Sequence, residues 1–114
     1  MNELIKHSES KLLIELGQAI VEVDRPALPV APRELIRRAN IWLEKNAYAL
    51  RTTICTNEDV RKHFESKDLD PLLVAISECI ATIAIQLPVG TIALLLVKRG
   101  LKTLCEVTWS EDVQ

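Results

Sequence analysis

Residues 72–97 read LLVAISECIATIAIQLPVGTIALLLV and form the longest apolar stretch of the sequence. The stretch is interrupted once, at Leu87-Pro88-Val89-Gly90, and the cationic pair Lys98-Arg99 follows it. About 20 apolar residues can cross a bilayer, but two shorter apolar helices can equally form the centre of a small bundle. The interpretation of this stretch therefore decides between a membrane protein and a globular one.

Polar and helix-breaking residues inside the stretch favour the globular interpretation. Glu78 lies within its first half, and a carboxylate at the centre of a bilayer costs about 2.5–3.5 kcal/mol on insertion scales. If Pro88 and Gly90 form a true turn, each half is too short to cross a membrane. We therefore predict two core helices, Pro71 to Leu87 and Thr91 to Leu104, each apolar nearly all round. The alternative is a membrane-associated effector that inserts residues 72–97 into a bilayer.

Helical periodicity continues through the N-terminal half of the chain. Apolar residues recur every three to four positions over residues 8–23, with Ser8 or Ser10 as the predicted cap, and again over residues 32–55. Three prolines make the intervening segment 24–32 a stiff connector. The last of them suits the first turn of the helix that follows.

The remaining segments complete a bundle. A short helix is predicted from Thr56 to Ser66 with Thr56 as its N-cap, and Asp70 is the predicted cap of the next helix. Residues 107–114 are an acidic tail, in which Trp109 is the one side chain expected to hold the tail against the domain. No alternating segment of useful length occurs, so strands are not expected. The predicted fold is all-α, a compact bundle of about five helices.

The composition fits one globular domain over residues 1–114. Hydrophobic residues make up 48% and charged residues 26%, which excludes the disordered class. A net charge of −2 excludes a broad nucleic-acid surface, and 4% aromatic residues leave little material for stacking on bases. Arg33, Arg37, Arg38 and Lys45 are accompanied by acidic residues, so we predict a solvated, ion-paired helix face there. No nucleic-acid partner is expected.

Three cysteines, Cys55, Cys79 and Cys105, are far apart in the sequence and form no C-x-x-C pair. An odd number without framework spacing predicts free thiols in a reducing compartment. The first residues carry charges where a signal peptide needs an apolar centre. We therefore expect a cytoplasmic protein.

Two groups are candidates for chemistry, and each also has a structural interpretation. Cys55 and His63 could form a thiolate–imidazole pair, but His63 lies in a charged string, and a half-buried thiol beside a surface histidine is favoured. Glu78 could be a buried acid with a raised pKa, but a position on a narrow polar seam that faces solvent is favoured. The cysteines and histidines lack zinc-ligand spacing. We predict no catalytic, cofactor or metal site.

The two apolar helices are the best indication of function. A domain this small has much surface for its volume, so five short helices are not expected to cover both apolar helices completely. Self-association or a protein partner would cover the excess. The predicted contact residues are Ile76, Ile80, Ile83, Ile92 and Leu96.

Two parts of the chain resemble known proteins. Ile41-Trp42-Leu43-Glu44, followed by Leu50-Arg51 and Cys55, resembles small helical proteins that accompany effector or conflict systems in bacteria. The run from Leu94 to Leu101, followed by Leu104-Cys105, resembles their C-terminal ends. The resemblance implies an accessory component that works beside an enzyme encoded elsewhere. We therefore predict a non-catalytic interaction module, acting as an adaptor, regulator or inhibitor.

Overall fold

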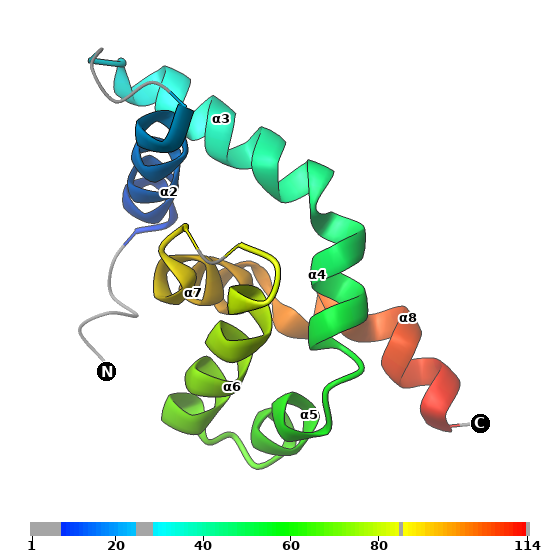
Figure 1. Cartoon of the computed structure of the whole chain (residues 1–114). Coiled ribbons are helices and arrows are strands. Elements are labelled where there is room, and N and C mark those ends of the chain that lie inside the picture. The colour runs from blue at the N-terminus through cyan, green and yellow to red at the C-terminus, as the bar shows by residue number, and fades with distance from the viewer. Residues whose placement is uncertain (1–7, 25–28, 85, 114) are drawn as a thin grey trace.

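Seven helices make up most of the chain that the structure describes, namely residues 8–24, 29–84 and 86–113 (Figure 1). In this computed structural model they are α2 (Glu9–Asp24), α3 (Pro32–Lys45), α4 (Ala47–Ile54), α5 (Glu58–Glu65), α6 (Leu69–Ala81), α7 (Val89–Arg99) and α8 (Leu101–Val113). The described residues contain no strand, so the prediction of an all-α fold is confirmed. The predicted number of about five helices is wrong, because two predicted helices divide.

The first division is at Asn46, within the predicted helix over residues 32–55. Asn46 has φ −102° and ψ 7°, which is not helical, and it separates α3 from α4. Its side-chain Nδ2 donates to the carbonyl oxygen of Trp42 at 2.9 Å, and its backbone N–H donates to the same oxygen at 3.0 Å. A short amide side chain competes in this way with regular helical bonding. The chain bends at this point (Figure 1).

The second division is at Gly100, within the predicted helix from Thr91 to Leu104. Gly100 has φ +110°, a conformation that favours glycine, and it ends α7 behind Lys98 and Arg99. A new helix, α8, starts at once and continues to Val113. The segment expected to be a tail beyond residue 107 is therefore helical.

The helix α6 ends at Ala81 and not at Leu87 as predicted. The hydroxyl of Thr82 donates to the carbonyl oxygen of Cys79 at 2.7 Å, and the backbone N–H of Thr82 bonds to the same oxygen at 3.2 Å. The last turn is thereby tightened and the helix stops. None of the described helices combines the length and the apolar character that crossing a membrane requires.

The helix starts follow the predicted caps in part. The backbone N–H of Lys11 donates to Ser8 Oγ at 3.1 Å, which confirms Ser8 as the cap of α2, and Pro32 opens α3 as expected. Asn57 and not Thr56 caps α5, since Asn57 Oδ1 accepts the Val60 N–H at 3.0 Å. The predicted cap Asp70 lies inside α6, which begins at Leu69. An earlier start of the first helix, at Asn2, falls outside the described residues.

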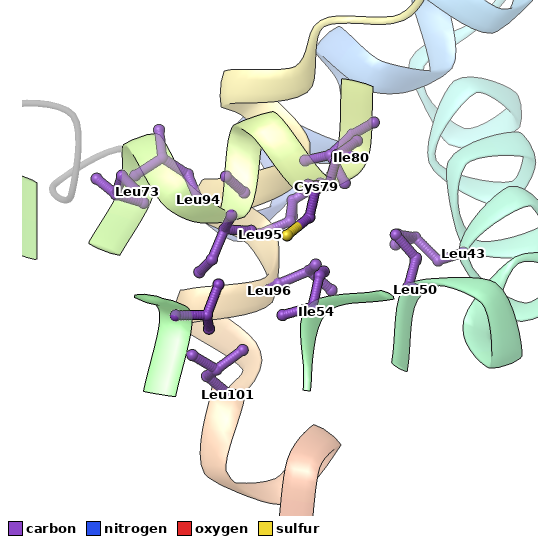
Figure 2. Packing of buried hydrophobic residues seen from close by; sticks show 14 of the residues in the cluster. Leu43, Leu50, Ile54, Leu73, Cys79, Ile80, Leu94, Leu95, Leu96 and Leu101 are labelled. Carbon is purple, nitrogen blue, oxygen red and sulfur yellow. The ribbon is translucent and has the colours of Figure 1, made fainter. Parts of the chain in front are cut away.

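The core is built around α7, which lies between α2 and α6 (Figure 1). All five consecutive side chains from Ile92 to Leu96 are buried, so α7 contacts other helices around most of its circumference. Figure 2 shows Leu95, Ile54 and Ile80 in one cluster, with the Cys79 sulfur inside it. These five residues confirm the prediction of a core helix for this part of the segment from Thr91 to Leu104.

A covalent link fastens α8 to the end of α4. Cys55 and Cys105 form a disulfide with their Cα atoms 5.3 Å apart. The Trp109 indole N–H also donates to the carbonyl oxygen of Cys55 at 2.9 Å, and its ring lies 5.0 Å from that of Phe64. Trp109 therefore holds the C-terminal segment as expected. The prediction of three free thiols is wrong for Cys55 and Cys105, because the fold brings together residues that are 50 positions apart.

Candidate functional site

Four of the five predicted contact residues lie inside the domain. Ile76, Ile80 and Ile92 have no exposed surface, and Leu96 is 8% exposed. They belong to the hydrophobic core and do not offer contact area themselves. Ile83 is half-buried and lines a groove of about 400 Å³ together with apolar side chains of α2 and α3.

A larger apolar groove, of about 690 Å³, lies where α2, α6 and the start of α7 meet. Its floor is made by Leu12, Leu73 and Leu94, which are all buried. We call it the α2–α6–α7 groove. The other described residues that line it are Glu15, Val74, Ser77, Glu78, Ala81, Val89, Gly90 and Thr91.

Val74 is the most unusual of the lining residues. It is a large apolar side chain that is 58% exposed, and it projects from α6 beside the buried floor. Asp70, Val74 and Glu78 are spaced four residues apart, so they lie in one row along the helix, and all three are exposed. The exposed row of α6 is thus an apolar side chain between two carboxylates, and Val74 and Glu78 of this row line the groove.

The described charges of the groove have one sign. Glu15 on α2 and Glu78 on α6 line it, and no Lys, Arg or His does. The Thr91 hydroxyl donates to Glu15 Oε2 at 3.3 Å, which joins α7 to α2. Among the described residues, no hydrogen bond or ion pair engages the exposed side chain of Glu78. The α2–α6–α7 groove therefore has an apolar floor and acidic edges.

The residues considered for chemistry lie in different surroundings. Cys55 is bonded to Cys105, so its sulfur is not a nucleophilic thiol, and His63 is half-buried on α5. Glu78 is exposed, as its position on the polar seam predicted. Cys79 keeps a free thiol, but burial raises its pKa and the nearby carboxylates of Glu78 and Asp59 raise it further. Within the described ranges, no group of three His, Cys, Asp or Glu could hold a metal ion.

The arginines of α3 form ion pairs within the helix. Glu34 Oε2 lies 2.6 Å from Arg37 Nη2 and 3.0 Å from Arg38 Nε, all on a solvated surface. The hydrogen bond from Arg37, with help from Arg38, holds the pKa of Glu34 at about 2, against an ordinary value of 4.5. The predicted ion-paired face is confirmed for these three residues.

Comparisons of the chain with protein-family models, with curated proteins and with solved structures find no match. The site is therefore defined by its own geometry. Sequence reasoning missed Val74, Glu15 and Gly90 as surface residues of one groove. The four-residue spacing of Asp70, Val74 and Glu78 was the available signal, because it places one apolar residue on the otherwise polar edge of α6.

Proposed function

We propose that the protein is a non-catalytic protein-interaction module, and that the α2–α6–α7 groove is its contact surface. The observation that carries this proposal is the exposure of Val74 above an apolar floor. A single exposed valine is ordinary on a protein surface. An exposed valine that continues a buried apolar floor offers a contiguous patch, and such patches are typical of binding sites.

The state of the candidate catalytic groups supports a binding role. The Cys55 sulfur is engaged with Cys105, and Cys79 lies in the core, where burial raises its pKa. A reactive cysteine needs a lowered pKa and access to solvent. A protein of this kind acts by occupying a surface of another molecule, as an adaptor, a regulator or an inhibitor.

The surface available for association is smaller than the sequence indicated. The chain itself covers Ile76, Ile80 and Ile92, so the uncovered apolar area of α6 and α7 is concentrated at the groove. A homo-oligomer and a different protein partner both remain proposals. The resemblance of residues 41–55 and 94–105 to accessory proteins of bacterial effector systems supports the second.

Site-specific crosslinking in the native host tests the proposal. A photo-reactive amino acid replaces Val74 in one variant and Val107 in a control, since Val107 is a similar side chain that is 67% exposed on α8. We expect discrete adducts from position 74 and none from position 107, with mass spectrometry identifying the adduct as a second copy or another protein. Absence of any adduct from position 74 contradicts the proposed contact surface.

A further inference from the structure

We infer that the α2–α6–α7 groove binds an amphipathic helix of a partner protein, and that this helix carries Lys or Arg on both sides of an apolar row. This inference rests on the proposed function and assigns the chemistry of the partner. The groove offers two features to a ligand, an apolar channel and carboxylates along its edges. The apolar floor would contact the apolar row of the partner helix, and the carboxylates would pair with its Lys or Arg side chains.

The shape of the groove selects a helix over a small molecule. Small-molecule pockets enclose most of the surface of their ligands. Here Val74, Gly90, Glu15 and Glu78 are all exposed along the edges, so the channel is open to solvent over its length. An open apolar channel between helices is the surface into which an amphipathic helix lays its apolar face, with contacts at positions i, i+3 or i+4, and i+7.

The start of α7 leaves room for such an approach. Gly90 is exposed in the wall of the groove, and a Cβ atom built on it would meet nothing within 4 Å. A partner side chain can therefore approach the α7 backbone closely at this point. The neighbouring residues Val89 and Thr91 are half-buried, so they extend the floor without closing the channel.

The charges select a basic partner. Glu15 lines the groove from α2 and Glu78 lines it from α6, and α7 packs against both of these helices. Asp70 extends the acidic row of α6 beyond Val74. Since no described cation lines the groove, an acidic or neutral helix would leave these carboxylates unpaired, whereas cations beside the apolar row would pair with them.

A second copy of this chain fits the groove less well. Besides Val74, the exposed large apolar side chains in the described part of the chain are Val23, Tyr48 and Val107, and each is on a different helix. Among the side chains that the structure describes, no helix therefore offers the required row of two or three exposed large apolar residues. The partner is therefore expected to be a different protein.

Two synthetic helical peptides of about 16 residues test the assignment on the full-length protein. Both carry the same leucines at positions i, i+3, i+4 and i+7, and they differ only in having Lys or Glu at the flanking positions. Binding is measured by fluorescence anisotropy at low and high salt. We expect the Lys peptide to bind about tenfold more tightly than the Glu peptide, with a difference that shrinks as salt screens the charges.

Variants locate the binding. Val74→Glu should abolish binding of the Lys peptide, whereas Val107→Glu, the matched change on α8, should leave it unchanged. Glu78→Lys should lower the affinity for the Lys peptide and raise the affinity for the Glu peptide. Both α6 positions are exposed, so circular dichroism should show that the variants stay folded.

Several results would overturn the inference. Equal binding of the two peptides, binding of neither, or binding that Val74→Glu leaves intact would each exclude a basic helix in this groove. A dimer seen by light scattering that Val74→Glu dissociates would assign the groove to a second copy. If position 74 still crosslinks to another protein while the peptides fail, the proposed contact surface stands and only the partner chemistry is wrong.

Discussion

Glu34 shows how one side chain can organise the charges of a helix face. It accepts hydrogen bonds from Arg37 and Arg38, and the Arg37 bond is the larger cause of its lowered pKa. Because the folded pKa, about 2, lies below the ordinary 4.5, the stabilisation by these pairs is complete above about pH 4.5. It is lost as the pH falls through about 2.

We expect Arg37→Gln to raise the pKa of Glu34 toward 4.5, and Arg38→Gln to raise it less. The physical reason is the loss of the shortest hydrogen bond to the carboxylate, 2.6 Å from Arg37 Nη2. An NMR titration of the Glu34 carboxyl group measures the shift, with Arg33→Gln as a control that keeps the hydrogen bonds from Arg37 and Arg38. Equal titration curves for Arg37→Gln and Arg33→Gln would show that the pair does not form in solution.

Some single-residue outcomes could be predicted and others could not. The solvated position of Glu78 followed from spacing, and Ser8 was one of the two predicted caps of the first helix. Thr56 and Asn57 are both good cap residues, and the choice between them depends on which one adopts the extended backbone conformation, here Asn57 with ψ 121°. Residue type therefore identifies the possible cap residues, and the backbone conformation determines which of them caps the helix.

At the scale of the helices, Gly17 sets the distance between α2 and α3. A Cβ atom at Gly17 would lie 2.6 Å from the carbonyl carbon of Leu35, which is far inside van der Waals contact. On helix propensity alone, Ala in place of Gly17 would favour an isolated helix by about 1 kcal/mol. The structure reverses the expected sign, because the packing requires the missing side chain.

We expect Gly17→Ala to lower the free energy of unfolding by about 1–3 kcal/mol, as overpacking does in a tight interface. Gly90→Ala is the matched control. It lies in the first turn of α7 with open space around it, so it should be neutral or stabilise by about 0.4–1 kcal/mol. Chemical denaturation of both variants measures the two changes in the free energy of unfolding. A stabilising Gly17→Ala would show that α2 and α3 do not approach this closely.

The presence of the helices was easier to predict than the points at which two of the predicted helices divide. The apolar period continues through Asn46 and through Gly100, so the pattern alone indicates one helix in each place. The breaks come from a side-chain hydrogen bond at Asn46 and from a positive φ at Gly100. Both residue types are common inside helical patterns, and only the packing of the flanking segments determines whether the helix ends there.

At the scale of the whole molecule, the sequence pointed to helices that line the proposed contact surface but not to the residues that line it. The predicted contacts on the two apolar helices were four isoleucines and Leu96, all strongly hydrophobic. The same property places Ile76, Ile80 and Ile92 in the core. The residues left at the surface are Val74 and its acidic neighbours. Their proposed role also depends on Glu15 of α2, which lies more than 50 positions before Val74 in the sequence.

The disulfide is the long-range feature that no local pattern indicated. It closes a loop between positions 50 apart, so replacing either cysteine should lower the free energy of unfolding by about 4 kcal/mol through the greater freedom of the unfolded chain. Thiol titration of the unreduced protein in denaturant should count one thiol per chain, from Cys79, and the folded protein should react slowly because Cys79 is buried. A count of three would contradict the link.

The cost of removing the link separates a covalent bond from ordinary packing. If Cys55 and Cys105 acted only as two small apolar side chains, Cys55→Ala and Cys105→Ala would each lower the free energy of unfolding. These two losses would add in the double variant. If they share one bond, either change removes it. The double variant should then lose little more free energy of unfolding than each single variant. Denaturation of the three variants, without reductant, therefore tests whether α8 is fastened to α4 or merely packed beside it. Since Trp109 also bonds to Cys55 through its indole N–H, we expect the near-UV circular dichroism of that ring to weaken in all three.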